Sequence, residues 1–473
     1  MNPTYESIRR SIESGETSCE TITAEMLGAI DDRPGLNAFL AVFRENAIAR
    51  AREVDRKFRD GTAGRLAGMV VAVKDVLCLR GERVTCGSKI LESFESLYDA
   101  TAVSRLLNED VIVIGKTNMD EFAMGSSSEH SAFGPVLNPV DSTRVPGGSS
   151  SGSGAAVAAG MAHTALGTDT GGSIRQPAAF CGVVGMKPTY GRVSRYGLVA
   201  LSSSFDQIGP FAHSTADAAR VLQVIAGKDD ADSTTSQDPV PDYLASLTKD
   251  VRGLRIGIPE EFLKEGICDD VLAAFHRAVD RLKEAGAKIS NVRLPHARYH
   301  IATYYILMTA EASSNLARFD GARYGYRSPR AKDLQEMYLL SRSEGFGQEV
   351  KRRIMLGTYV LSAGYYDAYY LKGQRVRRLI QSDFLEAFRA VDALLMPTTP
   401  TTAFRFGEKA SDPLQMYLSD VFTVSANLAG TPAISVPAGN DSEGLPIGIQ
   451  VMGKHFDEAT VLKVGDFLEE EVT

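Results

Sequence analysis

Two glycine- and serine-rich segments carry the residues with the clearest chemical potential. The first, PGGSSSGSG, spans residues 146–154, and the second, GTDTGGSIR, spans residues 167–175. Glycine lets a backbone turn sharply and approach a ligand closely, and successive N–H groups in such a turn can bind an anion. Ser173, at the end of the second turn, is therefore a candidate nucleophile with an oxyanion hole beside it.

Two other interpretations of these segments are disfavoured. Flexible linkers do not explain residues 155–165, whose small apolar pattern is typical of a packed helix followed by a short strand. A phosphate-binding loop is suggested by GKT at 115–117, which follows an apolar run at 111–114. That motif requires a glycine five residues before Gly115, and Asp110 stands there, so we reject it.

A serine nucleophile needs a base, and Lys74 is the main candidate. None of the seven histidines lies in a recognisable Ser-His-Asp motif, although the sequence does not exclude them. Lys74 lies in an apolar strand pattern, MVVAVKDV at 69–76, where burial would lower its pKa and keep the amine neutral. The alternative is a salt bridge between Lys74 and a carboxylate such as Asp75.

These residues together resemble the amidase signature family. Ser173 lies 24 residues after Ser149 and 99 residues after Lys74, and both separations fit that family. The resemblance covers nearly the whole chain. It implies an α/β fold with a mixed central β-sheet surrounded by α-helices. It also implies a Ser–cis-Ser–Lys triad, in which Ser173 is the nucleophile, Ser149 the bridging serine after a cis peptide bond, and Lys74 the base.

The turn before the nucleophile is expected to stabilise the tetrahedral oxyanion. The expected donors are the backbone N–H groups of Thr170, Gly171, Gly172 and Ser173. Asp169 and Arg175 are expected to hold this turn in place. They could also form an ordinary structural ion pair, and the two interpretations are compatible.

Further segments are similar to one branch of the family, the A subunits of glutamyl-tRNA(Gln) amidotransferases. They are NMDEFAMG at 118–125, GMKPTYGRVSR at 185–195, SFDQIGP at 204–210, EVKRRIMLGTY at 349–359, GYYDAYY at 364–370 and MYLSDVFT at 416–423. The resemblance implies that glutamine is hydrolysed to supply ammonia for the ATP-dependent conversion of Glu-tRNA(Gln) to Gln-tRNA(Gln). Whether Asp-tRNA(Asn) is also converted stays open. A stand-alone amidase acting on another small amide is the alternative.

The same resemblance implies a pocket for the amino acid. Arg353 would hold the α-carboxylate through a bidentate fork. Asp420 would hold the α-ammonium, and Tyr304 would add a contact. From the residues alone, Arg353 beside Lys351 and Arg352 is more typical of a solvated basic face, and Asp420 is equally typical of a helix cap.

Partners and cofactors are expected outside this chain. The resemblance implies a heterotrimer with amidotransferase subunits B and C. The formal net charge of −8 does not indicate a nucleic-acid-binding protein, so tRNA should bind mainly through a partner. We interpret the aromatic and basic stretch 365–378 as a packed helix with a charged outer face. No nucleotide motif or metal-ligand cluster is present, so ATP and Mg²⁺ are expected on the partner subunit and no cofactor in this chain.

Composition is that of an ordinary globular protein, with 473 residues of which 44% are hydrophobic and 23% charged. No apolar run reaches about 18 residues, and residues 1–13 do not resemble a signal peptide. The five cysteines form no C-x-x-C pair, which predicts reduced, mostly buried thiols. We therefore expect a cytoplasmic enzyme without a membrane partner.

Alternating patterns predict an α/β fold. We expect one amidase domain over 1–473, with a catalytic core at about 60–230 and a largely helical elaboration at about 296–390 that covers the pocket. Ser214 and Asp217 resemble a capping box. Strands are predicted at 69–76, 111–115, 182–187, 254–258, 391–396, 432–437 and 446–452. Helices are predicted at 5–31 (two helices), 100–108, 214–226, 270–285, 303–317, 358–387 and 457–470.

Overall fold

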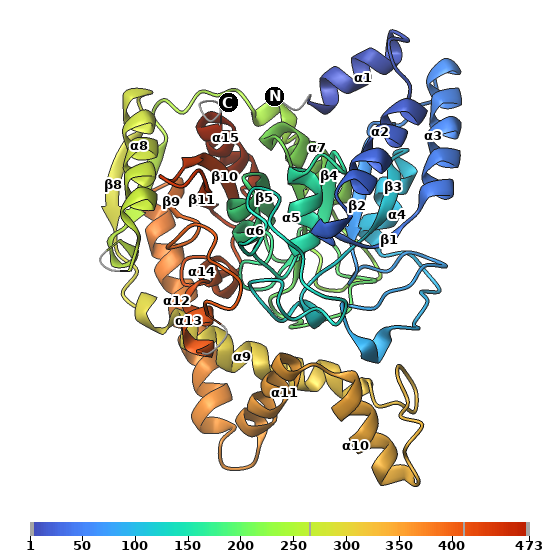
Figure 1. The fold of residues 1–473 in the computed structure, drawn as a ribbon. Helices are drawn as coiled ribbons and strands as arrows, with labels where there is room; N and C mark the ends of the chain where they lie inside the picture. The colour runs from blue at the N-terminus through green and yellow to red at the C-terminus, as the bar shows by residue number, and fades with distance from the viewer. Residues whose placement is uncertain (1–3, 264–265, 410–411, 470–473) are drawn as a thin grey trace.

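A computed structural model describes residues 4–263, 266–409 and 412–469 (Figure 1). In this part of the chain the strands form one mixed sheet of 11, in the order β1-β3-β2-β4-β6-β5-β10-β11-β9-β7-β8. This confirms the predicted fold class. The strands are β1 Phe39–Val42, β2 Val70–Lys74, β3 Ile112–Thr117, β4 Thr164–Asp169, β5 Val184–Lys187, β6 Gln207–Ala212, β7 Arg255–Pro259, β8 Lys288–Val292, β9 Ala393–Pro397, β10 Ala433–Asn440 and β11 Pro446–Gly453.

Helices surround this sheet, and a group of them extends beyond one end of the strands (Figure 1). That group is α9 to α11 with the first half of α12. The helices are α1 Tyr5–Glu13, α2 Cys19–Asp32, α3 Arg44–Arg59, α4 Thr101–Asn108, α5 Ser151–Ala158, α6 Arg175–Cys181, α7 Thr215–Ile225, α8 Asp269–Glu284, α9 His300–Asn315, α10 Leu334–Gly345, α11 Gln348–Leu361, α12 Lys372–Ala390, α13 Pro413–Leu418, α14 Val424–Ala429 and α15 Glu458–Glu469.

The strand β2 shows why the central strands are apolar throughout. Successive side chains of a strand point to opposite faces of a sheet. Val71 and Val73 belong to a core shared with α4, α7 and α15, whereas Val70 and Ala72 belong to a second core shared with α2, α3 and α5. Both faces of β2 are therefore covered, and its last residue, Lys74, is carried into the interior with it.

Most predicted elements are confirmed, and the misses have local causes. All seven predicted strands are present. The Ser214 hydroxyl caps α7 by accepting from the Asp217 N–H at 3.1 Å. The reciprocal half of the predicted capping box is not formed among the described residues, because the Asp217 carboxylate accepts from the Tyr5 N–H at 3.2 Å instead. The short strand expected at the end of 155–165 is β4, which covers Thr164–Asp169, and the sequence analysis missed β1, β6 and β8. The strand β6 contains Gly209 and Pro210, which argue against a central strand. The strand β8 is polar and largely exposed, and β1 has only 4 residues.

The helix predicted at 358–387 is wrong as a single element. The helix α11 ends at Leu361, a turn follows with Gly364 at φ +85°, a π-helical turn covers Asp367–Leu371, and α12 begins at Lys372. The basic residues of 365–378 do lie mainly on the surface. However, Tyr365, Tyr366 and Tyr369 are exposed too, because no other element covers the tip of this helical hairpin.

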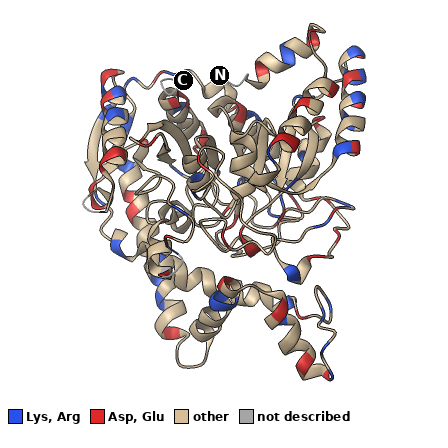
Figure 2. Ribbon diagram, in the orientation of Figure 1, with Lys and Arg blue, Asp and Glu red and all other residues tan. Residues whose placement is uncertain are grey.

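Charges of both signs are mixed on outer helices such as α3 and α8 (Figure 2). In the described part of the chain, no helix is long and apolar enough to span a bilayer. The five cysteines are unpaired and all but Cys268 are buried, as predicted.

Gly209 marks a close approach of two central strands. It is paired with Gly167 of β4, and a Cβ atom built on it would lie 2.0 Å from the Met186 carbonyl oxygen of β5. Gly28, in α2, has free space around the same position. A methyl group added at Gly209 should therefore destabilise the fold more than one added at Gly28.

We predict that Gly209→Ala lowers the free energy of unfolding by about 1–3 kcal/mol, because the backbones must move apart. Gly28→Ala should instead raise it by up to about 1 kcal/mol, since alanine favours a helix. Thermal unfolding of both variants checks this. Equal melting temperatures for the two would contradict the close approach.

Candidate active site

Lys74 lies in a shell of hydroxyl groups. Its Nζ is 2.9 Å from Ser149 Oγ, 2.8 Å from Ser150 Oγ and 2.8 Å from Thr168 Oγ1. The side chain is fully buried. Burial lowers the pKa of Lys74 to about 7, against a smaller opposing effect of nearby carboxylates. The amine can therefore exist in its neutral form near neutral pH.

The alternative of a salt bridge between Lys74 and Asp75 is wrong. Asp75 points elsewhere, because successive residues of an extended chain face opposite ways. Its carboxylate lies 3.3 Å from Lys116 Nζ and accepts from the Thr85 N–H at 2.9 Å. Asp75 thus pairs with a different buried lysine.

The hydrogen bonds of Ser150 determine how its hydroxyl can interact with the Lys74 amine. The Ser150 hydroxyl donates to the Thr168 carbonyl at 3.1 Å and accepts from the Thr168 N–H at 3.2 Å. Toward Lys74 it can therefore only accept. A neutral amine has two N–H groups and one lone pair. With Ser150 and the Thr168 hydroxyl taking the N–H groups, the lone pair is left for the Ser149 proton.

Ser149 follows a cis peptide bond after Gly148, as the family resemblance implies. Its carbonyl accepts from the Asp120 N–H at 3.2 Å. The Gly148 N–H donates to Gln176 Oε1 at 2.8 Å, and Gln176 Nε2 donates to the Ser126 carbonyl at 2.7 Å. The backbone is therefore held on both sides of the cis bond, by Gln176 at Gly148 and by Asp120 at Ser149.

Ser173 lies beside this cluster and is its most accessible member. It is 8% exposed, whereas Lys74 and Ser149 are at 0%. Its carbonyl accepts from the Ser150 N–H at 3.3 Å. Among the described residues its hydroxyl has no hydrogen-bond partner, and catalytic hydrogen bonds often tighten only when substrate binds.

Asp169 holds the turn that leads to Ser173. Its Oδ1 accepts from the Gly172 N–H at 2.9 Å, and its Oδ2 accepts from the Ile174 N–H at 3.2 Å. Arg175 Nη2 lies 2.8 Å from Asp169 Oδ1 in a fully buried ion pair. Burial acts to raise the pKa of Asp169, but the charge of Arg175 outweighs it and holds the pKa to about 2.

The glycines of the turn make room for two side chains. A Cβ atom on Gly171 would lie 2.5 Å from the Tyr304 hydroxyl oxygen, and one on Gly172 would lie 2.2 Å from Thr423 Oγ1. Tyr304 comes from α9, and Thr423 precedes α14. Tyr304 was predicted as a substrate contact and lies against the turn. Thr423 was missed as a site residue, although it ends the family-like segment at 416–423.

Asp420 lies in the same region and is buried. Its Oδ2 accepts from the Ser126 hydroxyl at 2.7 Å and from the Tyr305 hydroxyl at 3.5 Å. Burial raises the pKa of this carboxyl to about 7. The helix-cap alternative is wrong for its side chain, since only the Asp420 carbonyl bonds the following turn, at the N–H groups of Thr423 and Val424. Ser126 was not anticipated because one serine in a polar loop carries no distinctive pattern.

Arg353 turns into the protein, while Arg352 is exposed. Arg353 is 4% exposed and its Nε lies 2.8 Å from Glu349 Oε1. The solvated basic face that its neighbours suggested is therefore wrong for this residue. Together with Glu349, Tyr417 and Lys409 it lines a cavity of about 230 Å³.

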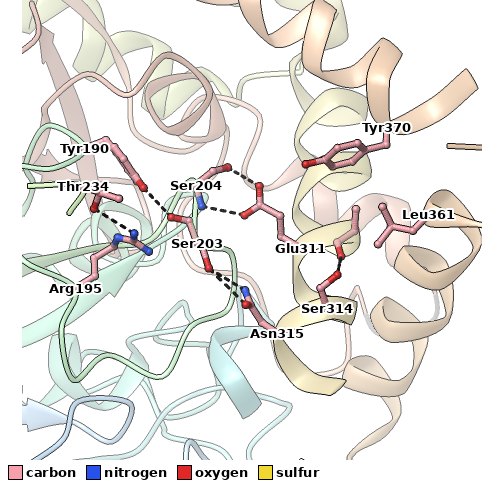
Figure 3. A pocket seen from close by; sticks show the side chains of 11 residues that line it. Tyr190, Arg195, Ser203, Ser204, Thr234, Glu311, Ser314, Asn315, Leu361 and Tyr370 are labelled. Carbon is pink, nitrogen blue, oxygen red and sulfur yellow. Dashed lines mark hydrogen bonds between the residues drawn. The ribbon is translucent and has the colours of Figure 1, made fainter. Parts of the chain in front are cut away.

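An open cavity of about 350 Å³ is lined by Ser203 and Ser204 and by residues of α9, among them Glu311 and Asn315 (Figure 3). Glu311 of α9 accepts there from the Ser204 N–H and hydroxyl and from the Ser202 hydroxyl. None of the predicted catalytic residues lines this cavity. The loop 202–206 beside this cavity contacts the turn before Ser173, because Asp206 accepts from the Thr170 hydroxyl at 2.7 Å.

Comparisons with known proteins identify the family of this chain. Residues 21–462 match the amidase family. The A subunit of the glutamyl-tRNA(Gln) amidotransferase of Chlorobium phaeobacteroides is 56% identical over 99% of both chains, and that of Acidobacterium capsulatum is 57% identical over 97% of both. The crystal structure of the Thermotoga maritima A subunit superposes with a TM-score of 0.82 at 43% identity, over 99% of this chain and 95% of the other. A peptide amidase from Stenotrophomonas maltophilia superposes with a TM-score of 0.82 at 31% identity, over 100% and 97%.

If Lys74 is the base, labelling of Ser173 by a serine-directed fluorophosphonate should accelerate with pH. We expect one ionisation with a pKa near 7, because only the neutral amine can take up a proton. The labelling rate between about pH 5 and pH 10 measures this, with Ser173→Ala as the unlabelled control. A labelling rate that shows no midpoint near 7 and still rises at pH 10, as an ordinary lysine would give, would contradict the proposed role of burial.

Proposed function

This chain belongs to the amidase signature family, and we propose that it is the glutamine-hydrolysing A subunit of a glutamyl-tRNA(Gln) amidotransferase. The observation that carries the proposal is a buried amine with a lowered pKa, Lys74, surrounded by serine and threonine hydroxyls. The identity of more than half the residues to subunits of that name supports this substrate over other amides.

The triad works as a proton relay. Neutral Lys74 accepts the Ser149 proton, Ser149 accepts the Ser173 proton, and Ser173 Oγ attacks the carboxamide carbon of the glutamine side chain. The proton then returns through Ser149 to the departing nitrogen, and ammonia leaves. Water then takes the place of ammonia and gives its proton to the same relay as it attacks the acyl carbon. The bond between that carbon and Ser173 Oγ breaks, the relay returns the proton to Ser173, and glutamate is released.

The developing oxyanion would be held by backbone N–H groups of the turn. The Gly172 N–H is already bonded to Asp169, so we narrow the oxyanion role to Thr170, Gly171 and Ser173. Each such donor stabilises the transition state by about 3 kcal/mol in comparable sites. The ion pair of Asp169 with Arg175 would keep these N–H donors pointing at the oxyanion without transferring a proton itself.

The amino-acid end of glutamine would lie between Arg353 and Asp420. A guanidinium suits the α-carboxylate because it offers two parallel N–H donors. Asp420 would become ionised as the α-ammonium approaches, since an adjacent positive charge lowers a carboxyl pKa. Tyr304, against Gly171, would contact the substrate between these charges and the nucleophile.

The helical elaboration at about 296–390 would complete this pocket. Tyr304 comes from α9 and Arg353 from α11, whereas the triad comes from the core at about 60–230. We therefore treat 1–473 as one amidase domain.

Ammonia made by this chain would be used by its partners. We propose a complex with subunits B and C, in which the larger partner binds tRNA, ATP and Mg²⁺. An internal channel would lead ammonia from Ser173 to the activated Glu-tRNA, because ammonia released to water is protonated and lost as a nucleophile.

The triad generates the first functional prediction. Ser173→Ala and Lys74→Ala should each lower glutamine hydrolysis at least about a thousandfold, because each removes an essential part of the relay. Ser149→Ala should be severely impaired as well. A glutaminase assay measures this, and circular dichroism verifies folding. Near-parental activity of Lys74→Ala would exclude a Ser-Lys mechanism.

The proposed complex leads to the second functional prediction. Reconstituted with subunits B and C, the chain should support glutamine-dependent conversion of Glu-tRNA to Gln-tRNA. With Ser173→Ala the reaction should fail with glutamine but proceed with an ammonium salt, since only the ammonia source is lost. Failure with both would mean that Ser173 does more than release ammonia. Efficient hydrolysis of unrelated amides by the isolated parent chain would favour the stand-alone amidase.

A further inference from the structure

A buried carboxylate, that of Glu349, lies against one edge of the Arg353 guanidinium. Glu349, one turn earlier in α11, places Oε1 at 2.8 Å from Arg353 Nε. Both side chains are 5% exposed. The positive charge of Arg353 outweighs the burial of Glu349 and lowers the pKa of that carboxyl. The pair is therefore ionised in a site that excludes most water.

Glu349 has further partners that fix its position. Its Oε1 also accepts from the Tyr417 hydroxyl at 3.2 Å, and its Oε2 accepts from Arg352. The Tyr417 ring stacks on Tyr305 with centroids 3.9 Å apart. One connected set of contacts thus leads from Glu349 to Tyr305, whose hydroxyl reaches Asp420.

The other edge of the guanidinium is available to a ligand. A guanidinium binds a carboxylate either through Nε and one Nη or through both Nη atoms. Glu349 occupies the Nε edge. Among the described residues, the one hydrogen-bond contact at the Nη atoms is the weak acceptor Met308 Sδ, 3.9 Å from Nη1. A substrate carboxylate is therefore directed to the Nη1–Nη2 edge.

We propose that Glu349 is a positioning residue that fixes how Arg353 receives the α-carboxylate of the substrate. The inference rests on the proposed role of Arg353. Glu349 holds the guanidinium so that only its end edge faces the ligand. Through Tyr417 and Tyr305 it also fixes the spacing between the carboxylate site at Arg353 and the ammonium site at Asp420. This spacing selects an α-amino acid over a simple amide.

The test is Glu349→Gln, which keeps the shape and an acceptor oxygen but removes the charge. We expect the KM for glutamine to rise about tenfold, because one charge-assisted hydrogen bond to Arg353 becomes neutral. We expect kcat to stay within about twofold and fluorophosphonate labelling of Ser173 to keep its rate, since that probe has no α-carboxylate.

Four further variants serve as controls. Glu344→Gln alters a half-buried carboxylate that pairs with Arg330 outside the cavity, and it should leave KM unchanged. Arg353→Lys should raise KM strongly, because a point charge does not replace the fork. Glu349→Gln should add little to KM in the Arg353→Lys background, since both act on one interaction. Tyr417→Phe, which removes the second donor to Oε1, should raise KM less than Glu349→Gln.

The outcomes separate the two proposals. An unchanged KM in Glu349→Gln, or a parallel loss of Ser173 labelling, would overturn the positioning role. A KM effect that persists fully in the Arg353→Lys background would also overturn it, because Glu349 would then act on the substrate directly. If the parent chain reconstituted with its partners does not hydrolyse glutamine, the proposed function itself fails, whatever Glu349 does.

Discussion

Burial of one amine at the end of a central strand is the constraint on which the site depends. Lys74 continues an apolar strand into the interior, where no carboxylate reaches it at salt-bridge distance among the described residues. The lowered pKa corresponds to a destabilisation of the ammonium form on the order of 5 kcal/mol. Hydroxyl groups around Lys74 are compatible with this low pKa, because they can accept hydrogen bonds from the neutral amine. A carboxylate there would restore the charge and remove the base.

Asp169 is a buried group that stays charged, in contrast to Lys74. Asp169 stays ionised because Arg175 and backbone N–H groups surround it. Removing one partner of such a buried pair typically costs about 3–5 kcal/mol. The pair shapes the turn before Ser173, whereas Lys74 would supply the reactivity. The two buried basic side chains thus differ in their partners, with hydroxyl groups around Lys74 and a carboxylate beside Arg175.

The pocket that we propose for the amino acid is assembled from parts of the chain that are far apart in sequence. Ser126 precedes the triad loops, Tyr304 and Arg353 come from α9 and α11, and Asp420 comes from the segment before α14. Each charged group there has a neutral or oppositely charged partner in the free protein. The pocket can therefore be buried before substrate arrives, which reduces the reorganisation that binding requires.

The sequence by itself determined the chemistry of the loops and the class of fold. Glycine-serine runs, an apolar strand that ends in lysine, and alternating strand and helix patterns are local features. They led to Ser173 and Lys74 and to an α/β fold, whereas the role of Ser149 and the mixed sheet surrounded by helices followed from the resemblance to the amidase signature family. The N-cap at Ser214 is local in the same sense, because it depends on residues 3 positions apart.

Only the tertiary structure decided which way individual side chains face and what lies next to them. Arg353 is one of two adjacent arginines, and the packing of α11 alone turns it inward beside Glu349. Strand β6, with its glycine and proline, forms because β4 and β5 flank it on both sides. Thr423 and Glu349 lie in segments that resemble the family, but no local pattern assigned a role to them or to Ser126. Each of the three makes a side-chain contact across 68 to 294 residues. Long-range burial and hydrogen bonding settle such positions, and no local pattern records them.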